Sequence, residues 1–233
     1  MSIRALVTDI EGTTSSIRFV HDVLFPYASK HLPAYVRAHE ADPDVAEQLR
    51  AVAREADLDG ADAERCLPVL LDWIASDRKA TPLKVLQGMV WEAGYRKGAF
   101  QGHVYPDAVQ GLRRWKQRGI DLYVYSSGSV AAQKLLFAHT PAGDLTALFS
   151  GYFDTRIGAK SEPVAYRRIV QEIGLPAEQI LFLSDVETEL SAARIAGMTT
   201  AWSARADNPQ ESLPGPHAAH PVIHSFDEVD RLF

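Results

Sequence analysis

The sequence predicts an α/β fold in which a doubly wound parallel sheet carries an inserted helical domain. Three observations support this class. Short apolar runs of strand length alternate with helical patterns in the second half of the chain, as in parallel sheets covered by helices. A polar or acidic residue follows each main run directly. More than a hundred residues separate the first run from the second, although one strand–helix–strand unit needs only about 30.

The predicted strands are short segments rich in β-forming residues, and glycines separate them from the helices that come before. Helical patterns lie between the later strands, and each stops at Gly119, Gly174 or Gly197, where a glycine is a typical helix end. The predicted strands cover residues 3–7, 120–125, 180–183 and 199–202, and the predicted helices cover residues 106–118, 161–173 and 187–196.

The long gap between the first two strands predicts a second domain of about 80 residues. Apolar stripes at helical spacing run through it, from Leu24 onward, from Leu67 onward and from Leu83 onward. Thr81 is predicted to cap the last of these helices, with proline at its first position. We therefore expect residues 15–100 to form a helical cap, and residues 1–14 with 101–233 to form the core. Residues 203–221 hold four prolines and are predicted to be a loop.

Composition narrows the class of function. The chain has 233 residues, 46% of them hydrophobic, which suits a globular protein that folds without disulfides. Its single cysteine excludes a disulfide framework and favours a reducing compartment. A net charge of −6 counts against nucleic acid as a partner. No apolar stretch is long enough to span a membrane, and the run before Thr8 is too short for a signal peptide, so we expect a cytoplasmic protein.

Two groups of polar residues follow the first two strands. Asp9 and Glu11 come directly after the first strand, where one carboxylate could attack as a nucleophile while the other handles a proton. Ser126 and Ser127 follow the second strand, where hydroxyls and the N–H groups of a helix start suit a phosphate. Each signal alone is weak, because a turn explains the first and an ordinary helix cap at Ser127 or Ser129 explains the second.

Two further groups follow later in the chain. Lys160 precedes a predicted helix and could neutralise a phosphate, although most lysines are solvated. Asp185 and Glu189 follow the most apolar strand and could hold Mg²⁺, or could simply lie near the positive end of a helix dipole. Because the carboxyl ends of parallel strands meet at one edge, all four groups are expected to converge there.

The order acid-x-acid, serine, lysine, aspartate resembles that of the haloacid dehalogenase superfamily of phosphohydrolases, over about two thirds of the chain. The resemblance implies that Asp9 is the nucleophile, that Ser126 and Lys160 hold the phosphate, and that one Mg²⁺ per chain binds at Asp9, Glu11 and Asp185. It also implies that Glu189 acts through a metal-bound water.

Glu11 departs from the superfamily pattern, because most of these phosphatases have aspartate two residues after the nucleophile. The segments at residues 9–14, 125–137 and 152–160 are similar to those of the enolase-phosphatase branch, which serves methionine salvage. This resemblance implies that a monomer converts 2,3-diketo-5-methylthiopentyl-1-phosphate to acireductone and phosphate through an enol phosphate. It also implies that both Ser126 and Ser127 contact the substrate, and we expect Glu11 to act as acid and base.

Other functions remain open at this point. A phosphatase of the same superfamily that acts on another small phosphate ester would need the same Asp9, Lys160 and Asp185. A haloacid dehalogenase is disfavoured, because Asp185 and Glu189 suit a metal which that reaction does not need. A binding module that kept the fold without catalysis predicts a lost nucleophile or lysine, and both are present.

Overall fold

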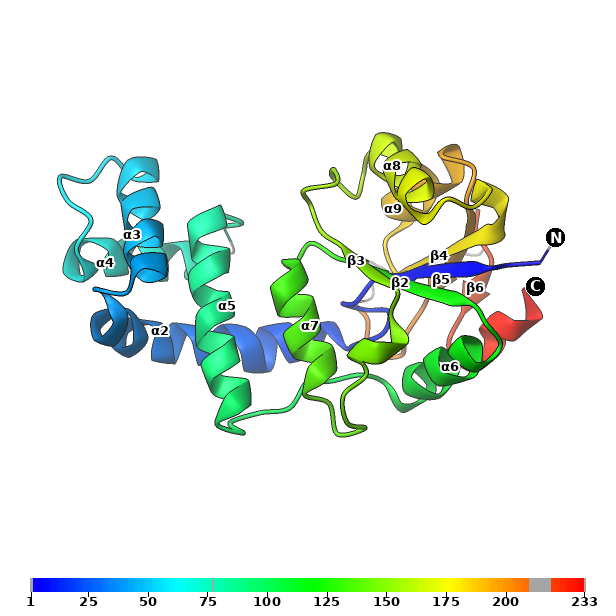
Figure 1. The fold of residues 1–233 in the computed structure, drawn as a ribbon, viewed down its shortest axis with the longest axis horizontal. Coiled ribbons are helices and arrows are strands. Elements are labelled where there is room, and N and C mark those ends of the chain that lie inside the picture. The colour runs from blue at the N-terminus through cyan, green and yellow to red at the C-terminus, as the bar shows by residue number, and fades with distance from the viewer. Residues whose placement is uncertain (1, 77, 210–218, 233) are drawn as a thin grey trace. The chain divides into compact units, whose positions relative to one another are not determined.

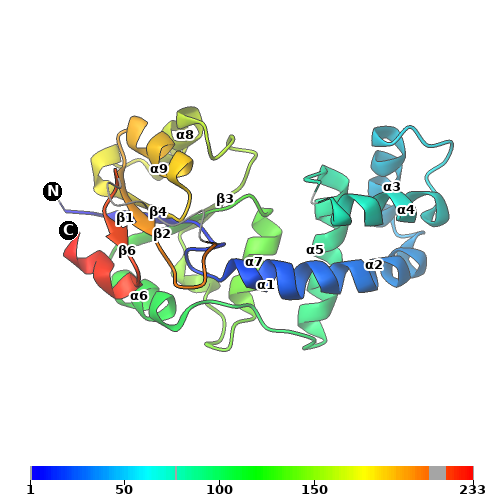
Figure 2. The same cartoon turned by 180° about the vertical axis from the view of Figure 1, so that it is seen from behind.

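A computed structural model of the protein describes residues 2–76, 78–209 and 219–232. The chain forms two compact units. The core unit comprises Met1–Ile17 and Gln101–Phe233, and the cap unit comprises Arg18–Phe100. Figures 1 and 2 show the α/β architecture of the core unit and the helices of the cap unit from opposite sides.

The core unit is built on a six-stranded sheet in which every neighbouring pair of strands is parallel. The strand order is β3-β2-β1-β4-β5-β6, so β1 lies between β2 and β4 near the centre. In chain order the strands are β1 (Ala5–Thr8), β2 (Asp121–Tyr125), β3 (Gly151–Phe153), β4 (Ile180–Ser184), β5 (Thr199–Ser203) and β6 (Val222–Ile223).

Helices cover both faces of the sheet, as Figure 1 shows for α8 and α9 on one side and α6 on the other. Side chains of β1 and β4, such as Val7 and Phe182, pack with Tyr166 and Ile169 of α8 in a buried cluster. The helices are α6 (Pro106–Gln117), α7 (Val130–Ala138), α8 (Pro163–Ile173) and α9 (Glu187–Ile195), with short 3₁₀ turns at Thr146–Leu148, Ala177–Gln179 and Phe226–Arg231.

The structure confirms the four predicted strands and the doubly wound class. It differs in three details of the core unit. β3 and β6 were not predicted, because three and two residues are too few to show a periodic pattern. α8 begins at Pro163 rather than at residue 161, because the residue before a proline is pushed out of the helical region, and Glu162 is extended. The predicted loop at 203–221 contributes Ser203 to β5, and its residues 210–218 lie outside the described part of the chain.

The cap unit is helical, as predicted, and has its own buried core. Apolar side chains at helical spacing fill that core, among them Leu32, Leu49, Leu70 and Leu86. Its elements are α1 (Ile17–Phe19), a π-helical turn (Val20–Leu24), α2 (Phe25–His39), α3 (Pro43–Glu55), α4 (Ala63–Ala75) and α5 (Thr81–Arg96). The expected capping role of Thr81 is wrong by one residue, because Ala80 is the N-cap and Thr81 is already helical.

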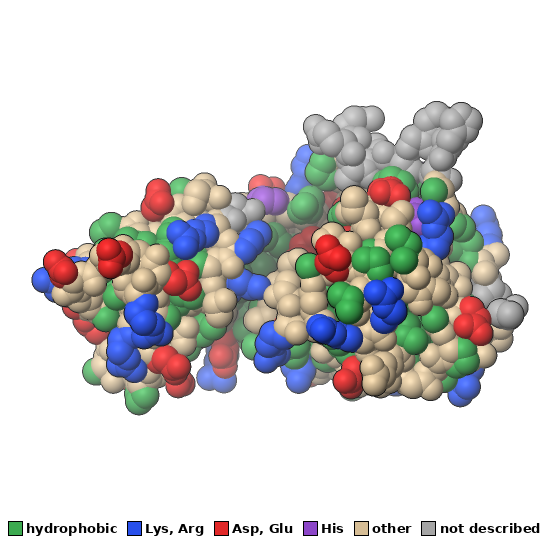
Figure 3. Space-filling view, turned by 90° about the horizontal axis from the view of Figure 1, so that it is seen from above, with side chains coloured by type: hydrophobic (Ala, Val, Ile, Leu, Met, Phe, Trp, Pro, Cys, Tyr) green, Lys and Arg blue, Asp and Glu red, His purple; other side chains and the backbone are tan. Residues whose placement is uncertain are grey.

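Charged side chains of both signs are mixed on the face of the molecule displayed in Figure 3. Acidic and basic residues alternate there rather than forming a field of one sign, which is the arrangement of an ordinary solvated surface. None of the helices within residues 2–76, 78–209 and 219–232 combines the length and hydrophobicity that crossing a bilayer requires.

Candidate active site

The site lies where the strand order changes direction. The chain passes from β1 outward to β2 and β3, and then returns to place β4 on the other side of β1. Loops at the carboxyl ends of two such strands diverge, which leaves a crevice where ligands bind in open α/β sheets. Asp9 follows β1, and its backbone N–H donates to the carbonyl of Leu183 in β4 at 2.9 Å. Asp185 follows the end of β4, so both acids stand at this junction.

Lys160 joins two of the predicted acids. Its Nζ lies 2.6 Å from Oδ1 of Asp9 and 2.7 Å from Oε2 of Glu189. All three side chains are mostly buried, with 8% of Lys160 and 4% of Asp9 exposed. Burial alone would lower the pKa of Lys160, but the two carboxylates raise it above its ordinary value. The lysine is therefore a fixed ammonium beside Asp9.

The remaining acids crowd the same junction. Burial and the charge of Asp9 raise the pKa of Asp185 to about 7. Burial and then Asp9 also raise the pKa of Glu189 to about 7 and that of Glu11 above its ordinary value. Gly12 has φ +72°, and a Cβ built there would lie 2.1 Å from Oδ2 of Asp185. The backbone at Gly12 therefore lies directly against the Asp185 carboxylate.

The serines after β2 have different surroundings. Ser126 is buried, donates from Oγ to Oε2 of Glu11 at 3.2 Å, and accepts from the N–H of Gly128. Ser127 is exposed. Ser129 is the N-cap of α7, and its Oγ accepts from the N–H of Ala132, which confirms one of the two predicted capping positions. The structure thus brings Ser126 together with Glu11.

The donor set suits a hard divalent cation. Four carboxylates, those of Asp9, Glu11, Asp185 and Glu189, share the junction with one lysine, and burial, followed by the charge of Asp9, raises the pKa of the other three carboxyl groups above its ordinary value. Mg²⁺ takes one or two carboxylates and keeps several waters. No group of three or more His, Cys, Asp or Glu side chains in the described part of the chain is arranged around a common metal position. Asp9 and Asp185 are the carboxylates that fit such a site, whereas the Glu11 side chain turns to Ser126.

Several side chains that were not predicted from the sequence hold the site loops in place. The Tyr125 hydroxyl donates to the carbonyl of Gly158 at 3.0 Å, and the Tyr166 hydroxyl donates to the backbone carbonyl of Lys160 at 2.8 Å. Gln133 donates from Nε2 to the carbonyls of Gly128 and Phe153, which ties the loop after β2 to the end of β3. The signal was present, because a glutamine on the apolar side of a short helix needs hydrogen-bond partners.

The fold and this set of acids with one lysine define a class, that of the haloacid dehalogenase-like hydrolases. The family of that description matches residues 3–197. Curated relatives named enolase-phosphatase E1 are 60% identical in Pseudomonas aeruginosa and 58% identical in Azotobacter vinelandii, each over at least 98% of both chains. The solved UTR4 protein of Saccharomyces cerevisiae superposes with a TM-score of 0.81 at 34% identity, over 97% of this chain and 99% of its own. The chain belongs to the enolase-phosphatase E1 family and is a phosphatase.

Proposed function

We propose that this chain converts 2,3-diketo-5-methylthiopentyl-1-phosphate to acireductone and phosphate, in two steps at one site. The observation that carries the proposal is the buried contact of Lys160 with Asp9, beside Asp185 and Glu11, at the β1–β4 junction. Asp9 and Asp185 would hold Mg²⁺, which when bound would polarise the ketone oxygen and offset the phosphate charge. Lys160 lies beside Asp9 and adds a positive charge for the phosphate.

Glu11 is the proton carrier in this proposal. Burial and the charge of Asp9 raise its pKa above the ordinary value, which moves it toward the range that suits a general base or acid. In the first step the Glu11 carboxylate takes the proton from carbon 1 of the substrate while the electron pair moves onto the oxygen of carbon 2, so the enol phosphate forms as its enolate and Glu11 is left protonated. Ser126 donates to Glu11 and so fixes the direction of that carboxylate.

Asp9 is the nucleophile of the second step. Its carboxylate oxygen forms a bond to phosphorus while the bond from phosphorus to the enol oxygen breaks, and Glu11 returns a proton to that oxygen. Acireductone then leaves as its enolate. Glu11 next takes a proton from water, which attacks the aspartyl-phosphate and releases inorganic phosphate, and Glu11 loses this proton to solvent before the next turnover. Because such transfers depend on positioning and charge neutralisation, the fixed pair of Lys160 and Asp9 is the central element.

The first test incubates the protein anaerobically with the diketo phosphate and Mg²⁺, and follows the enol products by ultraviolet absorbance and phosphate by a colorimetric assay. Both products should appear together, and Asp9→Asn should abolish phosphate release. Glu187→Gln is the matched control. Glu187 is the first residue of α9, shortly after β4, and its carboxylate accepts from the hydroxyl of Ser191 in the same helix. Phosphate release from simple esters without action on the diketone would instead indicate a general phosphatase.

A second variant tests whether Glu11 is the base that takes the carbon proton. Glu11→Gln should block enolisation, so neither the enol absorbance nor phosphate should appear. The amide keeps the length of the side chain, and its oxygen can still accept from Ser126. It can act neither as a base nor as an acid near neutral pH. Enolisation at the wild-type rate in this variant would mean that another group takes the carbon proton.

We also propose that the chain acts as a cytoplasmic monomer on this small phosphate ester. The two units each have their own buried core, and the single cysteine, Cys66, is buried in the cap unit. Light scattering coupled to size-exclusion chromatography should give a mass near 25.7 kDa. A mass near twice that value would contradict the monomer.

A further inference from the structure

We propose that Ser203, Arg205, Asp207 and Asn208 form a clamp that positions the loop carrying Asp9 and Glu11. This inference rests on the proposed function, because it assigns these side chains a part in the reaction of that site. Ser203 ends β5 and the other three follow it closely, and none of the hydrogen bonds and ion pairs described above joins them to the acids or to Lys160. We call them the β5 clamp, and residues 9–16 the nucleophile loop.

The clamp holds two consecutive carbonyls of the nucleophile loop. The carbonyl of Gly12 accepts from Oγ of Ser203 at 3.3 Å and from Nδ2 of Asn208 at 3.1 Å. The carbonyl of Thr13 accepts from Nε of Arg205 at 3.0 Å. All of these groups are buried, and donors paired with a buried carbonyl resist any rotation of that peptide.

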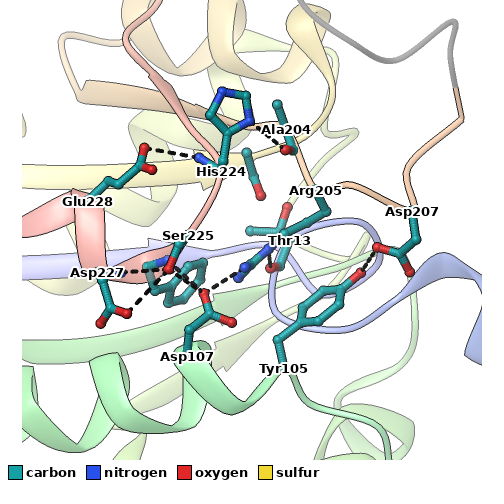
Figure 4. A network of polar contacts seen from close by, with 12 residues as sticks. Thr13, Tyr105, Asp107, Ala204, Arg205, Asp207, His224, Ser225, Asp227 and Glu228 are labelled. Carbon is teal, nitrogen blue, oxygen red and sulfur yellow. Dashed lines mark hydrogen bonds and ion pairs between the residues drawn. The ribbon is translucent and has the colours of Figure 1, made fainter.

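Arg205 is itself fixed from several sides, as Figure 4 shows. Its Nη1 donates to Oδ2 of Asp107 at 2.6 Å, and its guanidinium carbon lies 4.3 Å from the ring centre of Tyr105 and 4.9 Å from that of Phe226. Only 5% of the residue is exposed. A buried arginine is costly unless it is paired and hydrogen-bonded, so this position is a rigid support for the carbonyl of Thr13.

Asp207 holds the far end of the same loop. Its carboxylate accepts from the hydroxyl of Ser16 and, at 2.6 Å, from that of Tyr105 (Figure 4). The backbone N–H of Ser16 donates to Nδ1 of His103 at 3.0 Å. The nucleophile loop is therefore fixed in its middle at Gly12 and Thr13, and again at Ser16.

The fixed part of the loop adjoins the reacting groups. Gly12 follows Glu11 directly, and its backbone lies against the carboxylate of Asp185, where even a methyl group would collide. A turn of the Gly12 peptide would therefore move Glu11 and press on Asp185 at once. Catalysis is sensitive to such changes, because a displacement of about 1 Å can cost a hundredfold in rate. The clamp residues are positioning residues, since they act through the loop.

The test compares Asn208→Asp with wild type on the diketo phosphate. This change keeps the shape of the side chain but replaces the donor that faces the Gly12 carbonyl with an acceptor. We expect kcat to fall about tenfold or more while KM stays within about twofold, because the loop is misplaced in the transition state more than in the bound substrate. Amide hydrogen exchange of residues 9–16 should quicken, and that of β4 should not.

Ser225→Ala is the matched control. The Ser225 hydroxyl donates to the same Asp107 carboxylate to which Arg205 donates. Among the described hydrogen bonds, none joins Ser225 to the nucleophile loop. Its kcat and the exchange of residues 9–16 should stay within about twofold of wild type. If Asn208→Asp does not fold, Arg205→Lys makes the same comparison, because lysine keeps the charge beside Asp107 but lacks the second planar donor for Thr13.

The outcomes separate the clamp from the proposed function. A folded Asn208→Asp or Arg205→Lys with wild-type kcat and unchanged exchange of residues 9–16 would overturn the clamp. An equal loss of kcat in Ser225→Ala would overturn it too, because the effect would then be a general loss of packing. Wild-type protein that leaves the diketo phosphate untouched would refute the proposed function, while the hydrogen-exchange comparison would still decide for or against the clamp.

Discussion

Replacement of Lys160 by methionine should destabilise the protein strongly in the absence of metal. The side chain is buried, and its ammonium lies 2.6 Å from Asp9 and 2.7 Å from Glu189. Methionine fills nearly the same volume, so the change removes charge and hydrogen bonds rather than packing. Two carboxylates then remain in a poorly solvated place with no cation between them.

The magnitude follows from these distances. With an effective dielectric constant of about 20, each contact is worth about 6 kcal/mol of Coulomb attraction. The desolvation of the ammonium offsets much of the sum, and removal of one partner from a buried pair costs about 3–5 kcal/mol. We therefore expect the free energy of unfolding at pH 8 to fall by about 3–5 kcal/mol, and the urea midpoint by about 1–2 M.

Urea unfolding followed by circular dichroism, with chelator present, measures this change. The double variant Lys160→Met with Glu189→Gln supplies the control, since it removes one of the stranded carboxylates and should recover part of the loss. A loss below about 1 kcal/mol in the single variant would refute the reasoning. It would mean that solvent stabilises the charged groups of Lys160, Asp9 and Glu189 well enough that their ion pairs add little to stability.

Three further outcomes are expected. Gly12→Ala should lower phosphate release at least about a hundredfold in the colorimetric assay. The alanine Cβ would collide with Asp185, and the φ of +72° at this position disfavours residues other than glycine. Near-normal turnover would contradict this geometry. Burial would raise the pKa of Asp107, but hydrogen bonds from the N–H of Phe226 and from Arg205 hold it below its ordinary value. Its contribution to stability is therefore complete above about pH 5 and is lost as the pH falls through the lowered pKa, so Asp107→Asn should flatten the acid side of a thermal-stability profile. Ser129→Ala removes the cap of α7 and should lower the melting temperature by about 2–4 °C in differential scanning calorimetry, corresponding to about 1 kcal/mol, whereas an unchanged value would mean that water replaces the hydroxyl.

The sequence predicted those parts of the fold that carry a clear local pattern. β4 is apolar from Ile180 to Leu183 and was predicted to within one residue, since a strand buried on both faces reads as a continuous run. β3 has three residues and begins with Gly151, so only its pairing with β2 makes it a strand. In the cap unit, α3 was not predicted as a separate helix, although Val45, Leu49 and Val52 form its buried stripe.

The candidate site was predictable where residue type and position agree. Asp9 and Glu189 were named because they follow predicted strands, Lys160 because it precedes a predicted helix, and all three because of a resemblance. The structure brings them into direct contact. Their roles in the reaction stay a prediction. Arg205 was not predicted as a site residue, because a loop with several prolines gives no periodic signal. Its hydrogen-bond partners Thr13 and Asp107 also lie about a hundred or more positions away in the sequence. The one available signal was its place just after a strand, at the sheet edge that carries Asp9.

The central position of β1 has a consequence for how the chain is made. β1 leaves the ribosome before the other five strands of the sheet, yet Ala5 pairs with Asp121 and with Ile180, which are synthesised far later. Until then its edges are unpaired, and pairing across such a separation is slow. The cap unit, by contrast, is continuous over Arg18–Phe100 and has its own buried core. We therefore expect it to fold before β1 pairs with β2 and β4. Pulse proteolysis of stalled nascent chains should find residues 18–100 protected before residues 2–17, and the reverse order would contradict this sequence of events.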